Sequence, residues 1–316
     1  MSEFDEIANR NHYENKSVEK QKILDDLKTI IIDSKGSLEG NSFYHHASLN
    51  LFQDLYAKQL NLFWCGKQAS TKMCEIGFNA GHSTMLLLLG RDKTPLDFTV
   101  FDIGHHSYTA PCLNHIKSQF SHINFEYIEG DSTVTMPKWI EANQSQLGVY
   151  DVVHVDGGHS DQCISNDMKN ADLLVKKGGI VIIDDTNLHH INKYVYLYVS
   201  SGKYREMNVL HTKGYPHRII QKLIDNPVIQ YKDLKNLKYS WENNSILFLE
   251  NGQIDAFGKG TYIQVDTYKF QADFGHRSHL LVFNSDYTEF TSIRNGDGYI
   301  VKGKLITDHI FVGGTV

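Results

Sequence analysis

Short apolar runs alternate with amphipathic segments between residues 72 and 185, and this alternation limits the possible folds more than any other feature. The apolar runs are KMCEIG, DFTVFDI, INFEYIEG, YDVVHVDGG and GGIVIIDD, and between them lie STMLLLLG, TAPCLNHIKSQF, TVTMPKWIEANQ and SDQCISNDMKNADLLVKKG, which are typical of helices. Strands alternating with helices predict a parallel sheet with right-handed crossovers. REMNVLHT and HRIIQKLI, separated by KGYP, predict a hairpin and so an antiparallel terminal strand. The fold class is therefore α/β, doubly wound and mostly parallel.

Two regions flank this segment. Residues 1–70 are expected to be helical, because SVEKQKILDDLKTIIIDSK and HASLNLFQDLYAKQLNLF carry apolar residues at helical spacing. Residues 240–316 alternate apolar and polar residues around Asn-Gly and Gly-Asp-Gly turns, which predicts a small antiparallel β unit. We expect four parts: N-terminal helices at 1–70, an α/β domain at 71–225, a linker at 226–239 and the β unit at 240–316.

The composition narrows the class of partner. Hydrophobic residues make up 41% of the 316 residues and charged residues 22%, with a net charge of −6. No lysine or arginine run marks a track for nucleic acid, and no apolar stretch approaches the roughly 20 residues that span a bilayer. The polar N-terminus lacks a secretory core, and the four cysteines form no C-x-x-C pair. A cytoplasmic protein without nucleic-acid or membrane partners is expected.

The stretch CEIGFNAGHS predicts a cofactor-binding turn after the first strand. Asn79 occupies the place of the middle glycine of G-x-G-x-x-G, where a dinucleotide pyrophosphate needs close backbone approach. The side chain of Asn79 therefore argues against NAD or FAD. Glu75 offers an acceptor for an ammonium group, and the helix start after Gly81, with Ser83, offers donors for a carboxylate. An amino acid attached to a nucleoside presents both groups.

The next two strand ends continue this pattern. The strand FTVFD ends at Asp102, about twenty residues on, where a carboxylate can accept both hydroxyls of a ribose. The third strand leads into EGDS, residues 129–132, a polar end suited to an adenine edge. An acid at one strand end is commonly a helix cap, but three polar ends in succession favour a cofactor site.

On these motifs the chain resembles the class I S-adenosylmethionine-dependent methyltransferases, over roughly residues 51–223. The resemblance implies a Rossmann-like sheet and S-adenosylmethionine as cofactor. It places Glu75, Gly77, Asn79, Gly81 and Ser83 around the methionine part, Asp102 at the ribose, and Asp131 and Ser132 at the adenine.

The fourth and fifth apolar runs end in a cluster of titratable residues. VVHVDGGHS supplies Asp156 and His159, and GGIVIIDDTN supplies Asp184 and Asp185. Three carboxylates at one sheet edge repel unless something positive lies between them, and a hard divalent ion such as Mg²⁺ would meet that need. His159 could then take a proton from a hydroxyl. The alternative is structural, with Asp-Gly-Gly as a turn and an aspartate as a helix cap.

The D-G-x-H loop followed by an acidic pair resembles the metal-dependent O-methyltransferases, especially macrolide-sugar O-methyltransferases and the cephalosporin-hydroxylase-like group. That resemblance implies Asp156, Asp184 and Asp185 as metal ligands, with Asp156 also at the cofactor, and His159 as base. Catechol O-methyltransferases have an Asp-Asn pair and a lysine base. Here Asp185 replaces the asparagine and no lysine follows Asp156 in the loop, which favours a sugar-type alcohol over a catechol.

Other polar residues near these motifs are expected to have structural roles. Asp167 is interpreted as solvated or capping, and Cys163 as a buried helix residue. A structural role is favoured over contact with substrate for His217 and Arg218 in GYPHR. It is likewise favoured over contact with the cofactor for Tyr108 and the pair His105-His106. The aromatic residues of the β unit are interpreted as core, although a sugar-stacking face stays open.

The expected function is transfer of a methyl group to a hydroxyl of a sugar or glycoconjugate, with the N-terminal helices as a lid. A small phenolic or other metabolite is the alternative acceptor. Two further rivals are a hydroxylase-like enzyme, for which the loop offers only one of the two histidines that iron usually requires, and a glycan-binding module. The N-terminal helices or the β unit could form a homo-oligomer.

Overall fold

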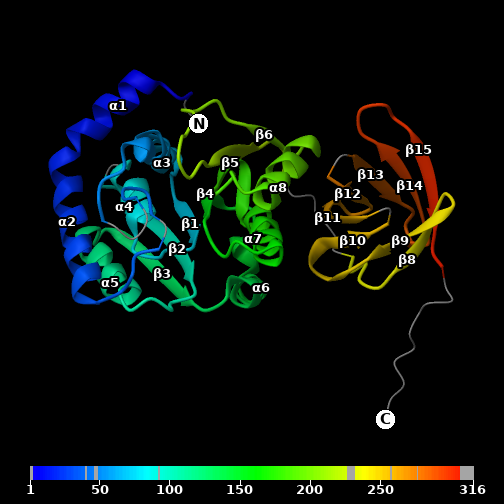
Figure 1. Cartoon of the computed structure of the whole chain (residues 1–316), viewed down its shortest axis with the longest axis horizontal. Coiled ribbons are helices and arrows are strands. Elements are labelled where there is room, and N and C mark those ends of the chain that lie inside the picture. The colour runs from blue at the N-terminus through cyan, green and yellow to red at the C-terminus, as the bar shows by residue number, and fades with distance from the viewer. Residues whose placement is uncertain are drawn as a thin grey trace, which may run out of the picture. The chain divides into compact units, whose positions relative to one another are not determined.

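The computed structural model describes residues 3–39, 41–45, 49–91, 93–225, 232–256, 258–275 and 277–306. It divides into two compact units, one from residues 1–195 with 204–225 and the other from residues 196–203 with 226–316 (Figure 1). The expected linker lies partly outside the described residues, as do the last ten residues of the expected β unit. Within the described ranges, no helix has the length and apolar character needed to cross a bilayer.

The first unit is built on a seven-stranded sheet of order β3-β2-β1-β4-β5-β7-β6. Its five parallel strands are β1 (Lys72–Ile76), β2 (Leu96–Asp102), β3 (Ile123–Glu129), β4 (Tyr150–Val155) and β5 (Val175–Ile183). β7 (Arg218–Lys222) runs antiparallel to β5 and pairs with β6 (Tyr204–Glu206). The predicted Rossmann-like sheet with an antiparallel terminal strand is confirmed.

Helices connect these strands as the alternation predicted. They are α4 (His82–Leu89), α5 (Thr109–Gln119), α6 (Ser132–Ala142), α7 (Asp161–Leu174) and α8 (His189–Ser200), with the 3₁₀ helix η3 (Gln144–Gln146) after α6. The fourth predicted helical segment ends earlier than expected, because β5 begins already at Val175. Asp131 caps α6 and Ser160 caps α7, since their side chains accept the amide hydrogens of Thr133 and Cys163.

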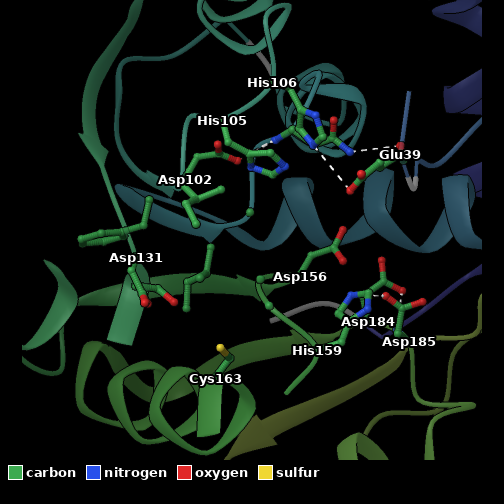
Figure 2. Close-up of a pocket in the computed structure, with 18 of the residues that line it drawn as sticks. Glu39, Asp102, His105, His106, Asp131, Asp156, His159, Cys163, Asp184 and Asp185 are labelled. Carbon is green, nitrogen blue, oxygen red and sulfur yellow. Dashed lines mark hydrogen bonds and ion pairs between the residues drawn. The ribbon is translucent and has the colours of Figure 1, made fainter. Parts of the chain in front are cut away.

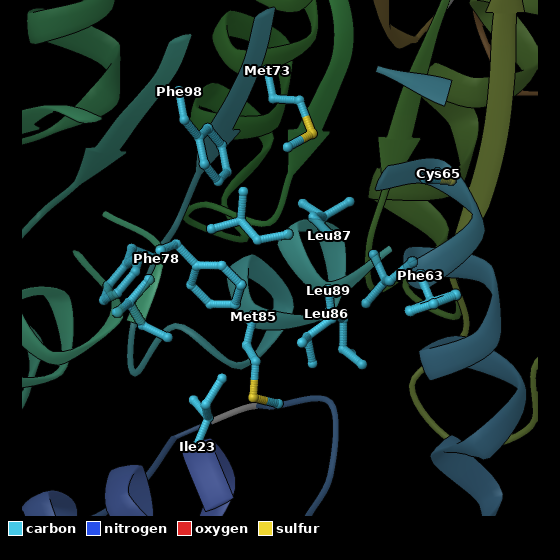
Figure 3. Close-up of a cluster of buried hydrophobic side chains, with 14 of the residues drawn as sticks. Ile23, Phe63, Cys65, Met73, Phe78, Met85, Leu86, Leu87, Leu89 and Phe98 are labelled. Atoms are coloured by element: carbon cyan, nitrogen blue, oxygen red, sulfur yellow. The ribbon is translucent and has the colours of Figure 1, made fainter. Parts of the chain in front are cut away.

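Three helices precede the sheet: α1 (Glu6–Asn15), α2 (Ser17–Asp33) and α3 (Tyr56–Gln68), the last following the 3₁₀ helix η2 (Gln53–Leu55). The second predicted N-terminal helix therefore begins about ten residues later than its apolar spacing suggested. α2 and α3 share one apolar core with the sheet and α4, as Figure 3 shows for Ile23, Phe63, Met85 and Phe98. The N-terminal helices thus belong to the α/β unit.

Two glycines bring α3 and α4 close together. A Cβ on Gly66 would lie 1.9 Å from the carbonyl oxygen of Leu87, and one on Gly90 would lie 2.0 Å from that of Phe63. Only glycine permits these approaches. α3 is therefore held against the helix that follows the predicted cofactor turn.

The second unit contains an eight-stranded antiparallel sheet. Its strands are β8 (Lys238–Trp241), β9 (Asn244–Phe248), β10 (Gln253–Asp255), β11 (Lys259–Asp266), β12 (Lys269–Asp273), β13 (Ser278–Phe283), β14 (Glu289–Arg294) and β15 (Ile300–Lys304), in chain order across the sheet. The 3₁₀ helix η4 (Glu250–Gly252) forms the predicted Asn-Gly turn between β9 and β10. The amide of Ile306 donates to the carbonyl of Lys238 at 2.8 Å, so the sheet curls back on itself.

The interior of this β unit is aromatic. Tyr239 packs edge-on against Phe248, Phe283 and Phe290, all of them buried. The predicted antiparallel unit is confirmed, and these rings form its core.

Candidate active site

The carboxyl ends of the parallel strands surround a cavity of about 450 Å³ (Figure 2). Most residues expected at the site line it: Gly77, Asn79, Asp102, Asp131, Ser132, Asp156, His159, Asp184 and Asp185. Three do not line it: Glu75, Gly81 and Ser83. The cavity also has lining residues that the motifs did not indicate, among them Glu39, Asn41, Lys58 and Tyr215.

The glycine turn is held by backbone geometry and by Asp102. Gly77 has φ +91°, and a Cβ there would lie 1.9 Å from the carbonyl oxygen of Asp156. Asp102 accepts the amide hydrogens of Phe78 and Asn79, both at 2.8 Å, and that of Gly104 at 2.7 Å. A carboxylate has about four acceptor positions, so about one stays open toward the cavity. Contact of Asp102 with both ribose hydroxyls stays a prediction, and the three amide hydrogens that this carboxylate already accepts hold it in place beside the turn.

Glu75 and Ser83 are hydrogen-bonded to each other beneath the turn. The Ser83 hydroxyl donates to Glu75 Oε1 at 2.6 Å, and the Thr84 hydroxyl donates to Oε2. Glu75 also lies 2.9 Å from His154 Nδ1, and both side chains are fully buried. In this structure Glu75 anchors the start of α4, where the sequence had suggested contact with the ammonium group. Ser83 likewise directs its hydroxyl away from the cavity.

Asp131 and Ser132, which were predicted to contact the adenine, line the cavity, and Asp167 lies next to Ser132. A Cβ on the lining residue Gly157 would lie 2.6 Å from Asp167 Oδ2. Asp167 is fully buried, and within the described part of the chain its carboxylate makes no hydrogen bond of standard geometry, although the Ser132 hydroxyl lies near enough to lower its pKa in part. Burial raises the pKa of Asp167 to about 7. The interpretation of Asp167 as solvated or capping is wrong, because α7 turns this position inward.

Asp167→Asn is expected to remove a pH dependence of stability. Between about pH 4 and 7 the folded protein keeps the Asp167 proton that the unfolded chain has lost, so the free energy of unfolding falls as pH rises. The slope reaches about 1.4 kcal/mol per pH unit. Urea unfolding from pH 4 to 8 should show the variant more stable than wild type at pH 8, with the two converging near pH 4.

Asp97→Asn is the matched control with the opposite sign. Its hydrogen bond from Lys72, 2.7 Å long, lowers the pKa of Asp97, so the substitution should lose stability above pH 4. Parallel pH curves for Asp167→Asn and wild type would contradict the burial argument.

The acidic end of the cavity contains two clusters of potential ligand atoms, each with all atoms within 4.8 Å of one another. One is Asp156, His159 and Asp185, and the other is His154, Asp156 and Asp184. Among the described residues, no such cluster contains both Asp184 and Asp185. His159 Nε2 lies 2.9 Å from Asp185 Oδ2, and Asp185 holds the uncommon φ of +51° (Figure 2).

Lys58 supplies a positive charge that the motifs did not reveal. It projects from α3 and its Nζ pairs with Asp184 Oδ2, both side chains being buried. Burial lowers the pKa of Lys58, but the charges of Asp184 and Asp156 outweigh that effect and raise it overall. Burial and the negative charge of Asp184 raise the pKa of Asp156. Burial also acts to raise the pKa of Asp184, but the charge of Lys58 and the neighbouring histidines outweigh it and lower that pKa overall. The metal was inferred because the three clustered carboxylates need a positive charge between them, and Lys58 supplies part of that charge.

Two buried histidines adjoin this pair. His154 Nε2 lies 3.9 Å from Asp184 Oδ2, and His217 Nε2 lies 2.9 Å from Asn61 Nδ2. Burial lowers the pKa of His217 to about 3, so it is neutral. The sequence carried a signal for this role of His154, because it is the one ionisable side chain among the valines of VVHV. An ionisable side chain in a buried strand needs a polar partner.

A third cluster lies at another part of the cavity wall. Glu39, His105 and His106 bring one carboxylate and two imidazoles within 4.8 Å, and His106 Nε2 lies 3.6 Å from Glu39 Oε2. His106 stacks on Tyr108 with ring centroids 4.8 Å apart. Tyr108 itself is buried and donates to Asn79 Oδ1 at 2.7 Å, so it supports the turn.

The remaining candidates separate into lining and supporting residues. Cys163 lines the cavity and is half-buried, which corrects its interpretation as a buried helix residue. Arg218 donates to Glu206 and Asn192 and does not line the cavity.

Comparison with known proteins bears on residues 74–186, which match the model of a family described as a methyltransferase domain. The matched stretch runs from the strand before the glycine turn to just past Asp185. A comparison with curated proteins gives no match. The family match supports a methyltransferase domain over these residues.

Several solved structures are similar in chain path. An O-methyltransferase from Bacillus cereus in complex with SAH is 16% identical, with a TM-score of 0.46 over 64% of this chain and 91% of that one. The O-methyltransferase TomG from Streptomyces achromogenes, involved in tomaymycin synthesis, is 15% identical, with a TM-score of 0.46 over 64% and 89%. An SAH-bound methyltransferase from Podospora anserina is 13% identical, with a TM-score of 0.45 over 71% and 99%.

Proposed function

We propose that the chain, with a methyltransferase domain at residues 74–186, transfers the methyl group of S-adenosylmethionine to a hydroxyl of a sugar or glycoconjugate with the help of a divalent ion. One observation carries this proposal. A single cavity joins the glycine turn and Asp102 at one wall to Asp156, His159 and Asp185 at another. A methyl donor and a group that removes a proton can therefore act in the same space.

The cofactor contacts follow from the lining residues. The turn at Gly77 and Asn79 presents backbone close to the cavity, and the open acceptor position of Asp102 suits one ribose hydroxyl. Asp131 and Ser132 line the same cavity and are assigned in this proposal to the adenine edge. Glu75 and Ser83 hold this wall from behind, and Asn79 is fixed by Tyr108.

A divalent ion fits the carboxylates of Asp156 and Asp185, whose oxygens converge within 4.8 Å at the cavity, while the imidazole of His159 beside them stays free to accept a proton. Asp184, the third carboxylate proposed as a ligand, is held by Lys58. A bound ion would polarise the acceptor hydroxyl and lower its pKa.

Proton removal falls to His159 in this proposal. Its imidazole takes the proton of the acceptor hydroxyl, a bond forms from that oxygen to the methyl carbon, and the carbon–sulfur bond breaks with its electron pair left on sulfur. The hydrogen bond to Asp185 orients the ring and raises the pKa of His159, which strengthens it as a base. The sulfonium becomes neutral in the same step.

His159→Ala is expected to lower the methyl-transfer rate constant about a hundredfold while leaving cofactor affinity unchanged. The side chain is half exposed and makes one ion pair, so the fold should persist. Isotope-labelled S-adenosylmethionine with an accepted hydroxyl compound measures the rate, and calorimetry measures the affinity. His190→Ala is the control, since His190 Nε2 lies 2.6 Å from the backbone carbonyl oxygen of His159 and does not line the cavity. A rate within threefold of wild type would remove His159 from the mechanism.

The acceptor class is the least constrained part of the proposal. A loop lysine is absent after Asp156, but Lys58 brings an amine into the same cavity from α3. The missing loop lysine therefore does not separate sugar hydroxyls from phenols, and the sugar class rests on the D-G-x-H loop alone. Parallel panels of sugars and catechols, each with and without EDTA, test the choice. Methylation of catechols only would contradict the sugar proposal.

A hydroxylase-like enzyme is the second candidate, favoured by one observation. Glu39, His105 and His106 provide the two histidines and one carboxylate that were missing from the D-G-x-H loop. Anaerobic titration with Fe(II), followed by measurement of oxygen consumption, tests it. Oxygen uptake that disappears in His106→Ala would support this candidate over methyl transfer.

A further inference from the structure

Lys58 forms an ion pair with Asp184, the carboxylate that a three-aspartate metal site would need as its third ligand. Asp184 Oδ2 pairs with Lys58 Nζ, and Asp184 Oδ1 accepts the backbone amide of Asp185 at 2.9 Å. Both oxygens of Asp184 are therefore engaged inside the protein. Asp156 and Asp185, in contrast, converge with His159 in a cluster that opens on the cavity.

The position of Lys58 is built into the fold. α3 cannot move away from α4 without separating Gly66 from Leu87 and Gly90 from Phe63, where the two backbones touch. The ammonium has more freedom than the helix, because Lys58 lines the cavity and its four-carbon stem can carry the charge into that space. Movement at this site is thus expected of the side chain and not of the helix.

We propose that Lys58 is a built-in competitor of the divalent ion, whose ammonium holds Asp184 when no ion is bound and must leave before Asp184 can become a ligand. The inference rests on the proposed function and adds the residue that sets the metal affinity of the site. The cost of separating a buried ion pair is subtracted from the binding free energy of the ion. Lys58 therefore keeps metal affinity low.

Titration with Mn²⁺, followed by electron paramagnetic resonance, tests the competition. All proteins carry His106→Ala, so that the cluster at Glu39 contributes no binding. Lys58→Met is expected to bind Mn²⁺ at least tenfold more tightly than the Lys58 protein, whereas Lys58→Arg should bind no more tightly. Lys72→Met is the matched control, because Lys72 pairs with Asp97 at the opposite end of β1. Equal or weaker binding by Lys58→Met would overturn the proposal.

Acetylation of the wild-type protein tests the displacement without a variant that could fail to fold. Saturating Mn²⁺ should raise the rate of acetylation of Lys58 at least fivefold, because the amine leaves its buried partner. Lys222, which is buried and pairs with Asp172 at 3.1 Å, should show no change. Unchanged labelling of Lys58 with Mn²⁺ bound, or no binding of Mn²⁺ by any of the proteins, would overturn the inference.

Titration of SAH into the same samples separates this result from the proposed function. Retained SAH binding with no Lys58 effect would remove only the competitor role. Loss of SAH binding in the wild type would remove the methyltransferase proposal itself.

Discussion

Replacing Gly77 by alanine is expected to abolish cofactor binding and to lower the free energy of unfolding by about 4 kcal/mol or more. The new Cβ would lie 1.9 Å from the carbonyl oxygen of Asp156, and the φ of +91° adds strain. Since Gly77 and Asp156 end neighbouring strands, relief requires β1 and β4 to separate at the cavity. Urea unfolding and calorimetric titration of SAH measure the two effects.

Gly178→Ala separates the collision from the strain. Gly178 has φ +79°, but no atom lies within 4 Å of its Cβ position, so the cost should be only the 1–2 kcal/mol or so of the left-handed conformation. SAH binding should be unaffected. Equal costs for the two variants would show that the approach of β1 and β4 is not tight.

Lys58→Met is expected to lower the free energy of unfolding by about 3–5 kcal/mol in EDTA, because it leaves Asp184 buried without its partner. The double variant Lys58→Met/Asp184→Asn should recover most of the loss, since no charge then remains unpaired. Lys72→Met removes an exposed pair and should cost at most about 1 kcal/mol. The measurement is urea unfolding at pH 7. A double variant as unstable as Lys58→Met would contradict the ion-pair explanation.

The sheet could be predicted from sequence because each of its strands and helices is marked by the pattern of apolar residues within its own short segment. Each parallel strand is an apolar run and each crossover has helical spacing, so a mostly parallel sheet with an antiparallel terminal strand could be predicted, although the order of its strands was not. The start of α3 was misplaced because apolar residues at helical spacing continue upstream of Tyr56 into the 3₁₀ helix η2 and the irregular residues 49–52. Apolar spacing records which residues are buried and does not fix where a helix begins.

The site could be predicted only where its residues end strands. Asp102, Asp156 and Asp185 line the cavity for that reason. Lys58 could not be found this way, because it reaches Asp184 from 126 positions earlier in the chain through the packing of α3. Asp167 was misread because its polarity suggested solvent, whereas the turn of α7 buries it.

Calorimetric titration of S-adenosylmethionine into the wild-type protein tests the central claim most directly. One site per chain with micromolar affinity is expected, and no binding to Gly77→Ala under the same conditions. Absence of binding by folded wild-type protein would contradict the assignment of the cavity at the glycine turn as a cofactor site.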